Sequence, residues 1–432
     1  LSLMTSTISS LLNQSKEWLK LPTFVNTCQT LLMTTELRAW TNGDLDKIVT
    51  KTDGYWVEYS DGTRLLDVQS GNSAYILGYG NQEVLNSLNS DVNFVRGNRG
   101  ETCELAQEMV KHVCETGNWD VLSWAISGSS AVESAIKMND QYWGNPENYI
   151  VTFTPSFHGT TFLCRAMGDD DNYVKRIKKV PTPLWKKKED QISAERKSFK
   201  YLQLLLKTYR GKVGCVVMET LPWLKGGIPW SSSWWKMVRH LCDEENVLLV
   251  VDDVACCWGK SGHWHGWQKY DVQPDISALG KSLTAGYTPL GCSVANKKVG
   301  DVIKNKDWEF GHTWQPTMTG IKAMSKVVEI IEREDLFSLT SHIEFCLKMI
   351  AENLLDRGYI TSYRCNDLFL SLDPQEKYMD ANGDLSMEAF MKSGLSLTKT
   401  RNGSIRLIAN FRSDAIFFEQ MEKRLIEFFQ RQ

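Results

Sequence analysis

Two residues near the middle of the chain have side chains that could act together in catalysis. Asp252 ends the apolar run VLLVVD (247–252), and Lys281 follows 29 positions later in LGKSLTAGY. Ligands of open α/β sheets bind just outside the carboxyl ends of the strands, where we expect Asp252. A carboxylate that pairs with a pyridinium nitrogen and a lysine that forms a Schiff base are the protein groups that pyridoxal 5'-phosphate (PLP) most needs. Taken alone, Lys281 could equally be an exposed lysine after a turn, and Asp252 a cap for the next loop.

The sequence around Lys281 also contains the Gly-Lys-Ser triplet of a nucleotide-binding P-loop. The full motif, G-x-x-x-x-G-K-[ST], requires a glycine at position 275, where this chain has Asp275. We therefore exclude a P-loop and keep Lys281 as a candidate for PLP binding.

A candidate phosphate site lies in AISGSSAVESAIK (125–137), where a strand-like start leads through Gly128 into a helix. The N–H groups and the positive dipole end at a helix N-terminus bind anions well. Gly128 would let the backbone approach phosphate oxygens, and the hydroxyls of Ser129 and Ser130 could add hydrogen bonds. The alternative is an ordinary serine cap of the helix.

A third candidate is the turn SFHGTTF (156–162), which directly follows a predicted strand. Phe157 could stack on a planar ring, and Gly159 indicates a backbone conformation or a close approach that other residues disfavour. The alternative is a core phenylalanine at the end of a strand.

The elements that must position these residues alternate between short β-rich runs and longer helical patterns. This alternation is typical of an α/β fold with a mainly parallel central sheet flanked by helices. The pattern predicts strands at 149–153, 211–219, 246–254, 366–372 and 404–409, and helices at 101–116, 129–143, 231–245, 319–357 and from 413. We expect a large PLP-binding α/β domain at 66–325. A smaller α+β domain would combine residues 1–65 with residues 326–432.

Composition excludes several classes of partner and compartment. The net charge of -3 has its acidic and basic residues mixed along the chain, so no nucleic acid or membrane partner is predicted. No apolar run is long enough to span a membrane, and the N-terminal segment lacks the pattern of a signal peptide. Eleven cysteines without a C-x-x-C pair indicate reduced thiols and a cytoplasmic protein. His263 and His265 form an H-x-H pair without further ligands at a supporting spacing, so no metal site is predicted.

Together and in this order, the segments resemble the class III (omega-type) aminotransferases, PLP-dependent transferases of fold type I. The resemblance extends from GYWVEYSDGTRLLDVQSG (54–71) to IRLIANF (405–411), and it depends on the combination of motifs. It implies PLP as the cofactor, small-molecule amine and carbonyl substrates, and a homodimer with the active site at the subunit interface.

The resemblance also implies a role for each matching residue. Lys281 corresponds to the Schiff-base lysine, Asp252 to the partner of the pyridine nitrogen, and Glu219 to a strand-end glutamate near the ring and substrate. Arg406, in SIRLIAN, looks like the arginine that binds a substrate carboxylate. The implied cofactor contacts are the phosphate turn, the two ring faces and a threonine from the partner subunit, namely Gly128, Ser129, Ser130, Phe157, His158, Val254 and Thr313.

The chain departs from the family pattern on the substrate side. Asp253 replaces a usual glutamate, Thr220 replaces a proline after the strand-end glutamate, Tyr79 replaces a histidine, and 409–410 (Ala-Asn) replace a Pro-Pro pair. The implied function is transfer of an amino group between an amino acid or ω-amine and a keto acid or aldehyde. The alternatives are an aminomutase of the glutamate-1-semialdehyde type and a degenerate PLP-binding scaffold without turnover.

Overall fold

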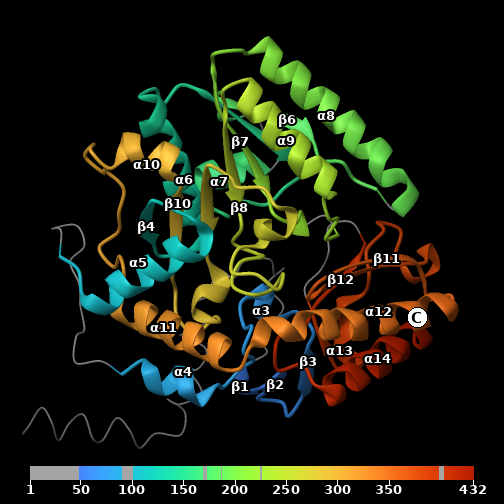
Figure 1. Cartoon of the computed structure of the whole chain (residues 1–432). Coiled ribbons are helices and arrows are strands. Elements are labelled where there is room, and N and C mark those ends of the chain that lie inside the picture. The colour runs from blue at the N-terminus through green and yellow to red at the C-terminus, as the bar shows by residue number, and fades with distance from the viewer. Residues whose placement is uncertain (1–47, 90–100, 169–172, 186, 224–225, 398–402) are drawn as a thin grey trace, which may run out of the picture. The chain divides into compact units, whose positions relative to one another are not determined.

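The computed structural model describes residues 48–89, 101–168, 173–185, 187–223, 226–397 and 403–432 (Figure 1). The part from Val49 to Gln432 forms one compact unit. Most of the predicted segment 1–65 therefore lies outside the described residues. The domain boundaries near residues 65 and 325 stay predictions.

A seven-stranded sheet forms the centre of this unit, with the strand order β4-β10-β9-β8-β7-β5-β6. Neighbouring strands from β9 through β6 run parallel, whereas β10 is antiparallel to both of its neighbours. The predicted α/β fold with a mainly parallel sheet is thus confirmed. The strands are β4 (Val121–Ala125), β5 (Tyr149–Thr154), β6 (Ile177–Pro181), β7 (Val213–Glu219), β8 (Leu248–Asp252), β9 (Ile276–Leu279) and β10 (Gly291–Ala295).

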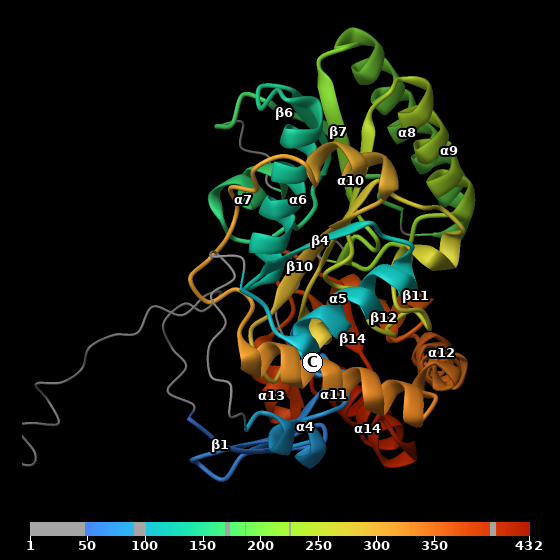
Figure 2. The same ribbon diagram turned by 60° about the vertical axis from the view of Figure 1, so that its left-hand side comes forward.

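Helices cover both faces of this sheet, which explains why its central strands are apolar along their whole length. In β7, Cys215 and Val217 face one hydrophobic core, and Val216 and Met218 face the other. Figure 2 shows α6 and α7 on the opposite side of the sheet from α8 and α9. The covering helices are α5 (Glu104–Gly117), α6 (Gly128–Trp143), α7 (Phe162–Gly168), α8 (Gln191–Thr208), α9 (Ser232–Glu244), α10 (Lys297–Ile303) and α11 (Met318–Arg333).

The N-terminal strands and the C-terminal elements lie together, blue beside red in Figures 1 and 2. One sheet has the order β1-β2-β3-β13, in which the C-terminal β13 pairs with β3 in parallel, and another has the order β11-β12-β14. Their strands are β1 (Val49–Asp53), β2 (Trp56–Tyr59), β3 (Arg64–Asp67), β11 (Ile360–Asn366), β12 (Phe369–Pro374), β13 (Leu395–Ser396) and β14 (Ile405–Ile408). Three helices belong to the C-terminal part: α12 (Thr340–Asp356), α13 (Met387–Lys392) and α14 (Ala415–Gln430).

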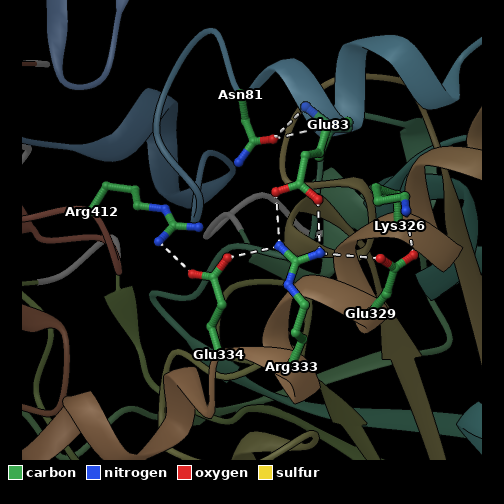
Figure 3. Close-up of polar contacts among 8 residues, drawn as sticks. Asn81, Glu83, Lys326, Glu329, Arg333, Glu334 and Arg412 are labelled. Atoms are coloured by element: carbon green, nitrogen blue, oxygen red, sulfur yellow. Dashed lines mark hydrogen bonds and ion pairs between the residues drawn. The ribbon is translucent and has the colours of Figure 1, made fainter.

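A network of ion pairs joins three segments that are distant in the sequence (Figure 3). Arg333, at the end of α11, donates to both carboxylate oxygens of Glu83 in α4 (Gln82–Ser87), each at 2.8 Å, and to Glu334 at 3.0 Å. Arg412, just before α14, donates to the other oxygen of Glu334 at 2.6 Å. The network links an N-terminal helix, α11 and the C-terminal segment.

Candidate active site

The predicted catalytic residues gather where the parallel strands of the central sheet end. Glu219 and Asp252 are the last residues of β7 and β8, and they are register partners on these adjacent strands. Gly128 follows β4, Phe157 follows β5, and Lys281 follows β9. Because these strands end at the same edge of the sheet, the fold brings residues from five separate segments together.

Asp252 is held in place by a buried histidine. Its Oδ2 accepts a hydrogen bond from Nδ1 of His158 at 2.9 Å, and its Oδ1 accepts one from the backbone N–H of Val254 at 3.1 Å. Burial lowers the pKa of His158, but the hydrogen bond and charge of Asp252 outweigh burial, so that its pKa is raised overall. Both carboxylate oxygens of Asp252 are therefore fixed by neighbouring N–H groups.

Glu219 is a second buried carboxyl at this edge. Burial raises its pKa to about 7, whereas the positive charge of His158 opposes the increase. Its Oε2 accepts a hydrogen bond from the backbone N–H of Phe157 at 3.1 Å. Glu219 can therefore gain or lose a proton near neutral pH, beside Asp252 on the neighbouring strand.

Lys281 begins a short 3₁₀ turn (Lys281–Thr284) with a positive φ of 46°. Such a backbone conformation is uncommon for a residue other than glycine, and it is often found at functional sites. The residue keeps part of its surface accessible, while burial still lowers the pKa of its amine, opposed by the charge of Asp252. This environment favours the neutral amine, which is the nucleophilic form.

Two glycines allow the lysine segment, the phosphate turn and Val254 to pack closely. A Cβ atom on Gly128 would lie 2.6 Å from Cγ1 of Val254. A Cβ atom on Gly280 would lie 3.2 Å from the same Cγ1 and 3.2 Å from the Cα of Gly128. These three segments therefore meet only because both positions lack a side chain.

The helix N-terminus at Gly128 has its own cap. Ser127 caps α6 by accepting from the N–H of Ser130 at 3.2 Å, and the Ser130 hydroxyl accepts from the N–H of Ser127 at 3.0 Å. The Ser130 hydroxyl thus takes part in the cap, and its predicted contact with a phosphate stays a prediction. The N–H groups of Gly128 and Ser129 have no intrahelical acceptor because they lie in the first turn.

The aromatic-His-Gly turn packs against this helix N-terminus. The N–H of Thr160 donates to Oγ of Ser129 at 3.2 Å, and Gly159 has a φ of 124°. A Cβ atom on Gly159 would lie 2.2 Å from the same hydroxyl oxygen. The backbone of the turn and the first turn of α6 therefore form one surface beside Asp252.

The two remaining predicted residues lie on other segments. Arg406 is buried in β14, where its Nη1 donates to the carbonyl of Trp223 at 3.3 Å and its guanidinium lies 5.3 Å from the Trp223 ring centroid. Trp223 follows Glu219 in the chain, so Arg406 is linked to the segment beyond β7. Thr313 is exposed in the loop between α10 and α11, and its predicted role requires a partner subunit.

The structure identifies contacts that the sequence analysis did not predict. His158 was predicted as a cofactor contact, but its bond to Asp252 was not. Nor did the sequence single out Trp223 or the buried Lys260, whose Nζ donates to the carbonyl of Ser73 at 2.6 Å. The G-K-S-G segment at 259–262, which closely follows Asp252, is the sequence feature that could have drawn attention to Lys260.

These residues fit PLP. Lys281 offers an amine whose pKa is lowered, Asp252 a carboxylate held by His158, and α6 an N-terminus that a glycine leaves open to an anion. Within the described residues, no group of three His, Cys, Asp or Glu side chains is arranged to hold a metal, and no helix is long and apolar enough to cross a membrane. The sheet and this set of residues define a PLP-dependent enzyme of fold type I.

Comparison with known proteins identifies the family. Residues 40–425 match the family model described as aminotransferase class-III. The chain is 25% identical to the adenosylmethionine-8-amino-7-oxononanoate aminotransferase of Geobacter sulfurreducens, over 70% of this chain and 72% of that protein. It is 23% identical to the (R)-1-hydroxy-2-aminoethylphosphonate ammonia-lyase of Vibrio splendidus, over 67% of this chain and 64% of that protein.

A solved structure shows the same fold. The taurine:2-oxoglutarate aminotransferase of Bifidobacterium kashiwanohense superimposes with a TM-score of 0.83 at 22% identity, over 91% of this chain and 95% of that one. The chain belongs to the class III aminotransferases, a family of PLP-dependent transferases. The predicted resemblance, fold class, enzyme class and cofactor are confirmed.

Proposed function

We propose that this chain moves an amino group between an amino acid or ω-amine and a keto acid or aldehyde, with Lys281 as the residue that binds PLP. The observation that carries the proposal is the convergence of Lys281, Asp252 and the N-terminus of α6 at one edge of the sheet. The comparisons do not favour the aminomutase alternative.

Each of these residues would have a role that follows from the chemistry of its side chain or backbone. When bound, PLP supplies an electrophilic carbon and a ring that accepts the electrons released when a substrate bond breaks. Lys281 would hold the cofactor covalently and, once released, accept the proton from the substrate α carbon, since its lowered pKa favours the neutral base. Asp252, held in place by His158, would hold a proton on the pyridine nitrogen. The first turn of α6 at Gly128 and Ser129 would bind the phosphate.

We propose that two of the other predicted cofactor contacts would enclose the ring. Val254 lies between Gly128 and Gly280 and would pack against one face, while Phe157 would pack against the other. Glu219 would lie beside the ring and substrate, where a pKa of about 7 lets it change charge in the working pH range.

We propose that Arg406 binds a carboxylate on at least one substrate. It is a buried guanidinium beside the segment that follows Glu219, and such a group recognises carboxylates with paired hydrogen bonds. The contact with Trp223 would then have to open or tilt, so this aromatic side chain would limit the size of the substrate near the carboxylate.

Two further parts of the proposal concern assembly and compartment. A homodimer would place Thr313 of the partner subunit at the phosphate, consistent with the exposure of Thr313 within one chain. Ten cysteines among the described residues are free thiols, which supports a reducing compartment such as the cytoplasm.

Half-reactions test the proposed activity. Purified holoenzyme would be mixed with a panel of amino acids and ω-amines while the absorbance of the cofactor is recorded. An aminotransferase converts the cofactor to its pyridoxamine form and releases a carbonyl product. Release of free ammonia without that conversion would favour a lyase, as the name of the Vibrio splendidus relative indicates for that protein. No response to any amine would favour the scaffold without turnover.

A further inference from the structure

Lys260 is a completely buried lysine that the proposed mechanism does not use. Its Nζ donates to the carbonyl of Ser73 at 2.6 Å and to the hydroxyl of Ser73 at 2.8 Å. Both acceptors are neutral, so no carboxylate in these two bonds compensates for the cost of burying an ammonium group. The free-energy cost of burying this ammonium group indicates that Lys260 has a role other than packing.

The acceptor, Ser73, belongs to an unusual turn, labelled α3 (Ser70–Ser73). All four of its residues have positive φ, from 46° at Ser70 to 70° at Ser73. Three of them are not glycine, so this left-handed turn is strained and must be held by its surroundings. Lys260 supplies two of the hydrogen bonds that hold it.

Ser73 also contacts two of the segments that carry proposed cofactor contacts, those of Val254 and Lys281. Its hydroxyl donates to the carbonyl of Ala255, which follows Val254, at 3.0 Å. Its carbonyl accepts from the hydroxyl of Ser282, which follows Lys281, at 3.5 Å. Lys260 and Ser282 therefore donate to the same carbonyl oxygen.

The ionisable groups that face these two lysines come from several elements. Those near Lys281 are Asp252, Glu219, Cys256 and Cys257, and those near Lys260 are Asp253, Cys256, Cys257 and Lys281 itself. Asp253 is already engaged by the hydroxyl of Thr220 at 2.6 Å and the N–H of Gly266 at 2.9 Å. Burial, together with the charge of Lys281, lowers the pKa of Lys260 to about 8. By reciprocity, a protonated Lys260 disfavours protonation of Lys281.

We propose that Lys260 is a positioning residue for Lys281: through its hydrogen bonds to Ser73 it fixes the segments that carry Lys281 and Val254. At this position its positive charge also disfavours protonation of Lys281. The inference rests on the proposed function, because it takes Lys281 as the lysine that binds PLP.

The test measures Lys281 directly in protein freed of cofactor. The rate of modification of Lys281 by an amine-directed acylating reagent would be followed by peptide mass spectrometry from pH 6 to 10. Loss of the neighbouring charge in Lys260→Met should raise the midpoint of this pH profile by up to about one unit, a tenfold change in protonation. Lys260→Arg, which keeps the charge, should restore the wild-type midpoint. The control is Lys269→Met, which removes a partly exposed lysine paired with Asp367.

The outcomes separate this inference from the proposed function. A folded Lys260→Met protein with an unchanged midpoint would overturn the positioning role, and Lys260→Gln provides the same test if the Met variant does not fold. A merely structural role would lower the melting temperature without moving the midpoint. If PLP and borohydride label a lysine other than Lys281 in the wild-type protein, the proposed function itself is wrong, whatever the midpoint.

Discussion

At the scale of residues, the contact between His158 and Asp252 positions the carboxylate at the end of β8. The two side chains lie 94 positions apart in the sequence and 2.9 Å apart in the fold, and both are buried. The hydrogen bond from His158 holds the Asp252 carboxylate in one orientation at the end of β8. A carboxylate fixed in this way suits a partner of a pyridine nitrogen.

Asp252→Asn tests this role. Asn keeps the shape of the side chain but removes its charge, so we expect the protein to fold while turnover falls by at least about 100-fold. Steady-state rates and melting temperature measure the two effects. Asp271→Asn is the control, because Asp271 is an exposed carboxylate whose left-handed conformation Asn tolerates. Near-normal rates in folded Asp252→Asn would refute the electronic role.

A second residue-scale prediction concerns His265, which is buried beside Trp119 and Trp267. Burial lowers its pKa from an ordinary 6.5 to about 3. As the pH falls below 6.5, the unfolded chain takes up a proton that the folded chain does not, so stability is lost by roughly 1.4 kcal/mol per pH unit. Between pH 6.5 and 5, the wild-type protein should therefore lose about 2 kcal/mol more than His265→Leu. Urea unfolding at both pH values checks this, and equal losses would contradict it.

At the scale of elements, the side chain of Asp414 both caps the N-terminus of α14 and accepts a hydrogen bond from Tyr55. Oδ1 of Asp414 accepts from the N–H of Phe417 at 2.9 Å and from the hydroxyl of Tyr55 at 3.0 Å. Asp414→Ala removes the cap and should lower the free energy of unfolding by about 1 kcal/mol. Asp414→Asn keeps an acceptor and should cost less. Denaturant unfolding of both variants tests the cap, and an equal loss in both would show that charge matters more than capping.

The sequence predicted the elements whose local patterns are long and clear, but not shorter strands such as β3, β6 and β10 or helix α8. β7 and β8 are continuous apolar runs, and α6, which begins at Gly128, has a clear helical pattern. β11 (ITSYRCN) was missed because its alternating burial includes polar side chains that resemble a loop. The left-handed turn at 70–73 has no local pattern either, because distant residues such as Lys260 hold it in place.

The candidate site was predicted for a different reason. The positions of Lys281, Asp252, Gly128 and Phe157 follow from motifs in a fixed order, and the sheet brings the strand ends together. The bonds of His158 to Asp252 and of Lys260 to Ser73 span 94 and 187 positions. Neither pairing can be predicted from a single sequence, because nothing in the residues next to each partner indicates the distant residue that it contacts.

At the scale of the whole molecule, the proposed dimer makes a prediction about Thr313. If the partner's Thr313 reaches the phosphate, Thr313→Ala should weaken PLP retention by about tenfold, the loss of one hydrogen bond to a charged group. Thr319→Ala, an exposed threonine in the first turn of α11, is the control. Cofactor release during dialysis and sedimentation velocity provide the measurements. A monomer that retains PLP as tightly as the native protein would contradict the shared site.

The central claim is that Lys281 carries the cofactor, and chemical fixation tests it most directly. Holoenzyme would be reduced with borohydride, digested and analysed by peptide mass spectrometry. The structure predicts one pyridoxyl label on the peptide that contains Lys281. This residue follows β9, lies near Asp252 and has an amine whose pKa is lowered. A label on Lys260 or on any other lysine, with none on Lys281, would contradict the proposed active site.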